Sequence, residues 1–297
     1  MSLLLWLLAL LLNGDRTQPP IPPIAISGVT TEERALALTF DACATKKQAN
    51  GFDEKIFEIL QREKIPVTIY MTGTWAEKHP SAVKQIAAAD WVEIGNHSYS
   101  HPRLTLLQPD RLRTQIRYTN RILLDKVGRP ALSLRPPAGA WNQDVLRAAN
   151  QENLPLVLWS VVSGDAGGHI PADRIRHVVL EQARPGSIVI FHINKRGPFT
   201  HKALPDIITG LREKGFRFVT VSQLLALPDA QPTSARQSRM GYKNLKSRAQ
   251  KANEGEAKPG EGAPAPEGQP SPDAAPPQEP AAPKQPPAGD GHENSSG

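Results

Sequence analysis

The sequence predicts an α/β fold: a distorted (β/α)7 barrel, complete or incomplete, followed by a disordered C-terminal tail. Short apolar runs alternate with amphipathic stretches over the first 228 residues, which is typical of a parallel sheet covered by helices. The runs are apolar at nearly every position, which indicates strands buried on both faces. Polar residues recur where the runs end, and in a β/α barrel these ends meet at one rim.

Seven strand-like runs are expected between residues 35 and 221. They are short and rich in apolar residues, as strands of a buried sheet are. In chain order they are "ALALTFD" (35–41), "PVTIYM" (66–71), "VEIGNH" (92–97), "LSLRPP" (132–137), "PLVLWSV" (155–161), "SIVIFHI" (187–193) and "FRFVTV" (216–221). A closed or nearly closed barrel fits this number of strands better than an open arrangement of two domains.

Six amphipathic stretches between the runs are predicted to be helices. Asp110 and Asn142 stand where helices are expected to start, and Gly128, Gly186 and Gly215 stand near expected helix ends. The predicted helices cover residues 52–64, 80–89, 109–127, 142–151, 172–183 and 202–214.

The composition divides the chain into three parts. Residues 25–228 have a length suited to one α/β domain. Residues 229–297 contain 12 of the 29 prolines and almost no Ile, Val or Phe, so they cannot bury enough apolar surface to fold and are expected to be disordered. Residues 1–24 are expected to be a signal or anchor segment with a linker.

The N-terminal segment predicts an exported protein. Leu3 to Leu12 reads "LLLWLLALLL", ten apolar residues, which is the length of a signal-peptide core and short for a membrane span. We therefore expect the protein in the periplasm, the cell envelope or the extracellular space.

Charge and cysteine content exclude several classes of function. The net charge of +6 is too small to indicate a nucleic-acid partner. A basic run from Arg236 to Lys251 is interpreted as a solvated linker, with contact to acidic lipid or cell-wall polymer as the alternative. The single cysteine, Cys43, excludes an intrachain disulfide and a cysteine-rich zinc site.

The candidate site consists of polar residues that stand at or just after the ends of the predicted strands. Such residues would converge on one rim of a β/α barrel, where catalytic groups collect. In chain order they are Asp41, His97, His101, Arg135, Asp165 and His192.

His97 and His101 are candidate metal ligands. Two neutral imidazoles four residues apart can reach one divalent ion if the backbone turns between them, and Gly95 and Pro102 would fix such a turn. This spacing alone is found more often in surface loops. An aspartate at a neighbouring strand end favours the metal site.

Asp41 could serve as a metal ligand or as a general base. A metal lowers the pKa of its water to about 7, so a nearby carboxylate can complete the deprotonation; a helix N-cap or turn role is the structural alternative. Arg135 precedes two prolines and cannot lie inside a helix. Its guanidinium could hold Asp41 ionised and oriented, or it could be a surface ion-pair partner.

His192 follows four apolar residues and could be a buried histidine bonded to the backbone. Alternatively, it protonates a leaving group while Asp165 holds its ring and raises its pKa. A base and an acid on opposite sides of an activated water make a hydrolase.

Five motifs in order resemble those of the NodB-homology polysaccharide deacetylases, carbohydrate esterase family four. They are "LTFDAC", "HSYSH", "RPPAG", "WSVVSGD" and "IVIFHIN", and the resemblance covers roughly residues 34–227. It implies that Asp41 is the catalytic base, that Arg135 orients it, and that Asp165 steadies the acid His192.

The resemblance also implies that His97 and His101 bind a divalent metal, with zinc expected and other transition metals as alternatives. The family's second aspartate, a metal ligand, is replaced here by Ala42, so a water, a rotated Asp41, Cys43 or another residue must complete the site. Cys43 is chemically a good zinc ligand, but a small buried residue is the favoured interpretation.

Two further departures concern the substrate groove. The usual tyrosine of the third motif is Ala138, whose backbone N–H would still serve an oxyanion hole. The usual aromatic residue after Asp165 is Ala166, which would open the groove. Trp141 could stack on a sugar face, although a core position is favoured.

Together these features predict a metal-dependent hydrolase that removes acetyl groups from a cell-envelope or extracellular polysaccharide, with N-acetyl groups favoured and O-acetyl groups as the alternative. One alternative is a degenerate member that binds glycan with little turnover, which Ala42 supports. Another is a hydrolase of the same fold acting on other non-peptide C–N bonds, against which the export segment argues.

Overall fold

The computed structural model of the protein describes residues 23–44 and 50–236. The expected N-terminal signal or anchor segment lies almost wholly outside these residues, as does the greater part of the expected tail. Within the described ranges, no helix is both long enough and apolar enough to cross a membrane.

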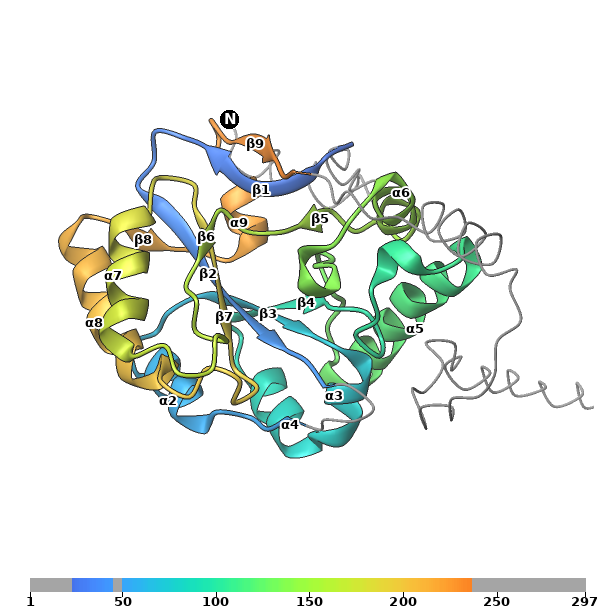
Figure 1. Cartoon of the computed structure of the whole chain (residues 1–297), viewed down its shortest axis with the longest axis horizontal. Coiled ribbons are helices and arrows are strands. Elements are labelled where there is room, and N and C mark those ends of the chain that lie inside the picture. Colours follow the sequence, from blue (N-terminus) through green and yellow to red (C-terminus); the bar gives the residue numbers. More distant parts are fainter. Residues whose placement is uncertain (1–22, 45–49, 237–297) are drawn as a thin grey trace, which may run out of the picture.

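A parallel sheet lies at the centre of the molecule (Figure 1). Its strands follow the order β4-β3-β2-β7-β6, and β8 pairs with the start of β2. The strands are β2 (Ala35–Ala42), β3 (Val67–Met71), β4 (Val92–Asn96), β6 (Val161–Val162), β7 (Ile188–His192) and β8 (Arg217–Phe218). Because every ladder is parallel, the carboxyl ends of these strands lie at the same edge.

A second, three-stranded sheet extends the first. It has the order β5-β1-β9, from β1 (Ala25–Thr30), β5 (Leu156–Val157) and β9 (Gln231–Ser234). Leu134 joins the two sheets through single bridges, to Asn96 of β4 and to Leu156 of β5. The two sheets are therefore joined into a ring of strands only by isolated bridges, and the barrel is not closed. This confirms the predicted distorted (β/α)7 class.

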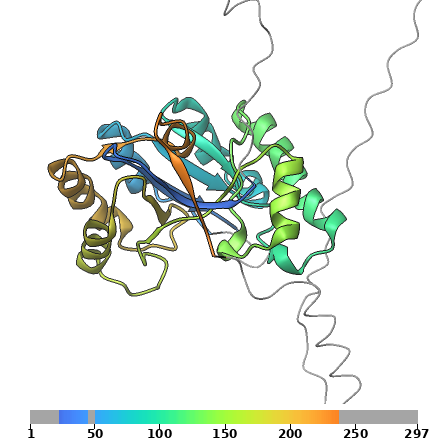
Figure 2. The same ribbon diagram turned by 90° about the horizontal axis from the view of Figure 1, so that it is seen from above.

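Helices surround the sheets on their outer faces. Figures 1 and 2 show α7 and α8 on one side of the molecule and α5 and α6 on the other. The helices are α2 (Glu54–Arg62), α3 (Gly73–Lys78), α4 (Pro80–Ala88), α5 (Pro109–Val127), α6 (Gln143–Gln151), α7 (Ala172–Gln182), α8 (Thr200–Glu213) and α9 (Val221–Leu225), with short 3-10 turns at Leu104–Leu106 and Pro137–Gly139.

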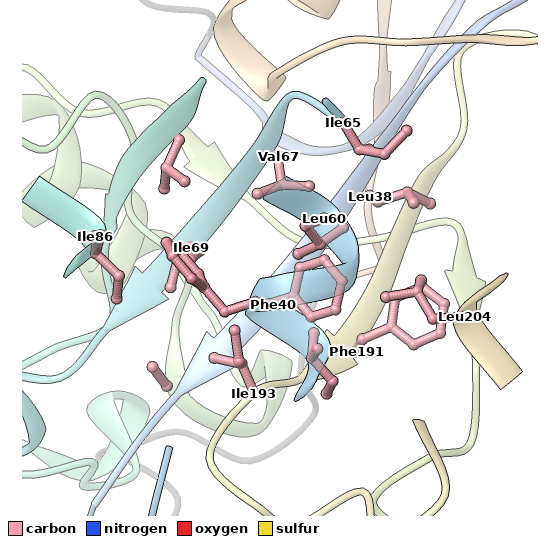
Figure 3. Close-up of a cluster of buried hydrophobic side chains, with 14 of the residues drawn as sticks. Leu38, Phe40, Leu60, Ile65, Val67, Ile69, Ile86, Phe191, Ile193 and Leu204 are labelled. Atoms are coloured by element: carbon pink, nitrogen blue, oxygen red, sulfur yellow. The ribbon is translucent and has the colours of Figure 1, made fainter. Parts of the chain in front are cut away.

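Alternation along β2 decides what each face of the central sheet contacts. Its even-numbered residues, among them Leu38 and Phe40, belong to the core between sheet and helices. Phe40 stacks on Phe191 of β7 with ring centroids 5.4 Å apart, and Leu204 of α8 lies beside them (Figure 3). Burying each such side chain contributes about 1.5–3 kcal/mol. The opposite face of β2 is left for the odd-numbered residues, including Asp41.

The observed strands differ from the expected ones in several places. The run at 132–137 contributes only the Leu134 bridges, because Pro136 and Pro137 have no N–H to donate. The run at 155–161 divides into β5 and β6. Strand β1 was not expected, since Gly28 interrupts its apolar run at a register shift.

Strand β9 corrects the expected domain boundary at residue 228. Its four residues pair antiparallel with β1, and the Trp141 indole donates to the carbonyl of Arg236. Residues 231–234 thus form a strand and Arg236 accepts a hydrogen bond, where the sequence predicts a disordered tail. A ladder of backbone hydrogen bonds does not require an apolar sequence, so "QPTS" gave no signal.

Candidate active site and metal centre

The site begins with two neighbouring strand ends. Asp41 on β2 and His192 on β7 are direct partners in the parallel ladder, and adjacent strands lie about 4.8 Å apart. Partners in register present their side chains on the same face of the sheet. The fold thus brings together two groups separated by about 150 positions in the sequence, as expected for residues at the ends of parallel strands.

Arg135 holds the Asp41 carboxylate in place from the buried side of the site. Its guanidinium is fully buried and donates to Asp41 Oδ1 at 2.9 Å and to the Leu158 carbonyl at 3.0 Å. The guanidinium also lies over the Tyr70 ring, 4.0 Å from its centroid. Burial opposes ionisation of Asp41, but its neighbours His97, Arg135 and His192 outweigh this effect and keep the pKa of this carboxyl below its ordinary value. Asp41 is therefore a carboxylate at neutral pH.

His192 is held by Asp165 through two contacts. Asp165 Oδ1 lies 2.9 Å from His192 Nδ1, and Oδ2 accepts from the His192 backbone N–H at 2.7 Å. Thr200 Oγ donates to the same Oδ2 at 2.9 Å. Burial alone would lower the pKa of His192, yet the hydrogen bond and charge of Asp165 raise it. The ring is thereby oriented with Nε2 away from Asp165.

His97 follows β4 and its ring orientation is defined. Nδ1 lies 2.8 Å from the Arg135 carbonyl oxygen, and since a carbonyl only accepts, Nδ1 carries the proton. Burial lowers the pKa of His97, with Asp41 partly opposing, so the ring is neutral. Its unprotonated Nε2 then faces Asp41 Oδ2 at 3.5 Å. No hydrogen is available between these two acceptor atoms, and a divalent cation would satisfy both of them.

Two further ligand-type side chains adjoin His97. Donor atoms of Cys43, His97 and His101 all lie within 4.8 Å of one another, and the two imidazole rings meet edge-on with centroids 5.0 Å apart. Burial, followed by the proximity of the His97 imidazole, lowers the pKa of His101 to about 3. Burial and the charge of Asp41 raise the pKa of the Cys43 thiol to about 11. The donor set of two neutral imidazoles and a thiol suits a zinc-like ion.

Unusual backbone conformations collect around this site. Ser98, His101 and Ala138 have φ of +66°, +59° and +55°, a left-handed region that non-glycine residues occupy at a cost. His101 adopts it as the chain turns back so that its ring meets His97. Ala138 adopts it in the short turn after Arg135, where the residue is exposed.

The structure also identifies residues that the sequence did not. Asn194 is buried and its amide donates to both the carbonyl and the sulfur of Cys43, at 2.8 and 3.1 Å. Thr200 lies in none of the five quoted motifs and Asn194 closes "IVIFHIN" without a role of its own, since only the folded chain shows that both reach the site. Trp141 is buried in the cluster beside α6, so it is unavailable for stacking on a sugar.

Known proteins resemble this chain in sequence and in fold. Residues 28–157 match the family described as "Polysaccharide deacetylase". A peptidoglycan-N-acetylglucosamine deacetylase of Bacillus cereus is 37% identical over 191 residues, which cover 64% of this chain and 67% of the relative. A crystal structure of a peptidoglycan N-acetylglucosamine deacetylase bound to a substituted N-hydroxybenzamide superposes with a TM-score of 0.62 at 32% identity, covering 71% of this chain and 94% of that one.

A catalytically deficient relative is equally similar in fold. A family 4 carbohydrate esterase pseudoenzyme of Bacillus anthracis superposes with a TM-score of 0.62 at 27% identity, covering 68% of this chain and 69% of that one. A mutant of that pseudoenzyme is described as having restored enzymatic activity. On sequence and on fold, the chain belongs to the polysaccharide deacetylase family.

Proposed function

We propose that this protein is a metal-dependent hydrolase that removes N-acetyl groups from a cell-envelope polysaccharide. Asp41 acts as general base and His192 as general acid, with Arg135 and Asp165 positioning them. The observation that carries the proposal is the ladder pairing of Asp41 with His192, each supported by its own buried partner.

The base is prepared by Arg135. Because one oxygen of Asp41 accepts from the guanidinium at 2.9 Å, the other remains directed toward His97 and the edge of the sheet. A water there would give its proton to Asp41 as its oxygen adds to the acetyl carbonyl carbon. A positioned base of this kind contributes about a hundredfold or more to the rate.

The acid completes the reaction. His192, protonated on both nitrogens, keeps Nδ1–H on Asp165 and donates the Nε2 proton to the departing sugar nitrogen. The C–N bond of the amide breaks, acetate leaves with the oxygen of water, and the sugar retains a free amine. The proton taken by Asp41 and the proton given by His192 balance one another.

The metal would be held by His97 and His101. A divalent ion, zinc or another transition metal, supplies a Lewis acid that polarises the acetyl carbonyl and makes the attacking water more acidic. The backbone N–H of Ala138 would donate to the oxygen of that carbonyl as negative charge develops on it. Ala138 stands on the exposed turn that follows Arg135, which supports this assignment.

Acetate release tests the proposal directly. Zinc-loaded protein would be incubated with peptidoglycan, chitin oligomers and acetylxylan, and acetate and free amino groups would be quantified. We expect acetate with equimolar new amines from an N-acetylated glycan. His192→Gln should reduce release by at least about a hundredfold without loss of folding. Absence of acetate from every substrate with the wild-type protein would refute the proposal.

A second candidate function is glycan binding with little turnover. Ala42 supports it, because a carboxylate expected from the family resemblance is missing, and a pseudoenzyme shares the fold. The intact Asp41–Arg135 and His192–Asp165 pairs favour turnover. Saturable binding of a chitin oligomer without acetate release would favour the second function.

The proposed substrate lies outside the cytoplasm, so we also propose export. The relatives named above include peptidoglycan deacetylases, and the apolar segment at residues 3–12 would serve as signal or anchor. Association with membrane or cell wall through this segment or the basic run after Arg236 belongs to the same proposal. Protease accessibility of the protein in intact cells, with and without residues 1–24, tests it.

A further inference from the structure

We propose that Cys43 is the third protein ligand of the metal, which makes this a Cys-His-His centre selective for thiophilic ions such as zinc. The inference rests on the metal dependence in the proposed function and extends it to a residue for which the family resemblance gives no role. It also answers how the site can bind an ion although position 42 is alanine.

The first argument is the direction of the Cys43 side chain. Along β2 the even-numbered residues Leu38, Phe40 and Ala42 face the helix-covered core, whereas Asp41 faces the site. The ladder between β2 and β3 continues through Ala42 and Met71, so alternation still holds at the strand end. Cys43, two residues after Asp41, therefore returns to the face that carries the catalytic carboxylate.

The second argument is proximity to two imidazoles. The sulfur lies within 4.8 Å of the nearest donor nitrogens of His97 and His101. Donor atoms around a tetrahedral zinc are about 3.5 Å apart, given Zn–S of about 2.3 Å and Zn–N of about 2.0 Å. Closing the remaining gap requires a displacement of about 1 Å. The turn from Ser98 to His101 and the strand end at Cys43 are the segments that would adjust.

The third argument is the support around the sulfur. Asn194, itself buried, donates its amide to the Cys43 sulfur at 3.1 Å and to the Cys43 carbonyl at 2.8 Å. A hydrogen bond to a ligating thiolate orients it and stabilises its charge, as partners of metal ligands commonly do. A purely apolar pocket would hold a structural thiol equally well without such a donor.

Ligand chemistry then predicts metal preference. Thiolate is a soft ligand and selects zinc or cobalt over magnesium or calcium, which prefer oxygen. An Asp-His-His site is more tolerant of hard ions than a Cys-His-His site. Replacement of carboxylate by thiolate would therefore narrow the range of ions that this chain accepts.

Cobalt spectroscopy tests the inference on the untagged full-length chain. Cys43 is the single cysteine of the sequence, so a thiolate-to-cobalt charge-transfer band in the near ultraviolet identifies it without ambiguity. We expect this band on titrating the metal-free protein with Co²⁺, and its loss on adding excess zinc. Visible cobalt bands without the charge-transfer band would overturn the inference, as would the absence of any bound cobalt.

Variants extend the test. Cys43→Ser should abolish the charge-transfer band and weaken zinc binding, measured by competition with a chromophoric chelator, by at least about tenfold. His101→Ala should weaken zinc binding similarly. Unchanged zinc affinity in Cys43→Ser would contradict the inference. Should Cys43→Ser fail to fold, the wild-type spectrum alone decides.

The outcome is separable from that of the proposed function. A charge-transfer band without acetate release would keep Cys43 as ligand and refute the deacetylase activity. Acetate release from a protein whose bound cobalt lacks the band would do the reverse.

Discussion

The two halves of the site differ in how far the protein itself satisfies them. In the acid half, formed by Asp165, His192 and Thr200, both oxygens of the carboxylate are hydrogen-bonded and the imidazole is oriented. In the metal half, formed by Cys43, His97 and His101, the nitrogens and sulfur lie within 4.8 Å of one another. There His97 Nε2 also faces a carboxylate oxygen.

This difference indicates where an external charge is needed. The acid half is complete without any ligand, since Asp165 neutralises the imidazolium. The metal half brings two imidazole nitrogens and a thiol together beside a carboxylate, and a cation would offset the cost of holding these lone pairs close to one another. Left-handed backbone at Ser98 and His101 adds to that cost. We therefore expect cation binding to change the metal half strongly and the acid half little.

Asp41 stands between the halves, and its replacement has the largest expected effect. Asp41→Asn keeps the size of the side chain but removes the base, so acetate release should fall by at least about a hundredfold while zinc content is retained. Turnover would be measured on an N-acetylated glycan and zinc by elemental analysis of the same sample. Loss of zinc in this variant would place Asp41 in the metal half as a ligand.

Removal of the metal should destabilise the fold to a smaller extent. At a zinc concentration of about 100 times the dissociation constant, binding contributes about 2.7 kcal/mol, or about 5–10 °C in Tm for a domain of this size. Calorimetry with and without a chelator measures the shift. His101→Ala is the matched control, and because its zinc binding should be weakened at least about tenfold, its shift should fall to about half or less. An equal shift in His101→Ala would mean that zinc binds elsewhere.

The acid half was the easier half to predict from sequence. Asp165 and His192 follow strands whose ends meet in any β/α barrel, and their pairing needed only that registration. Arg135 was expected beside Asp41 for the same reason. The structure has both contacts, although the chemical roles of these residues remain predictions.

The metal half was harder to predict because it depends on the direction of individual side chains and on how they pack. Cys43 is buried, as the favoured interpretation expects, but a lone cysteine carries no spacing pattern that would show which groups its sulfur faces. Its side-chain direction follows from where β2 ends, and strand ends are poorly defined by sequence. Asn194 reaches the Cys43 sulfur only because β7 lies beside β2, which the sequence alone does not show. The edge strand β9 is hard to predict for a related reason, because the backbone hydrogen bonds that hold it do not require a particular sequence.

The smallest expected effect comes from changing the charge in the acid half. Asp165 raises the pKa of His192 against the influence of burial, so the acid stays protonated to higher pH. Asp165→Asn should therefore move the alkaline limb of kcat/KM to lower pH by about one unit or more.

The stabilising effect of the His192–Asp165 pair is fully present below the unfolded pKa of about 6.5 and is lost as pH rises through the raised folded pKa. Asp165→Asn should accordingly lose stability mainly below the unfolded pKa of His192, where the pair is fully charged in the wild-type protein.

Thr200→Val is the control for the pH profile. It removes one hydrogen bond of Asp165 but keeps the charge of Asp165, so the alkaline limb of this variant should stay nearly in place. An alkaline limb that does not respond to Asp165→Asn would mean that another group supplies the proton.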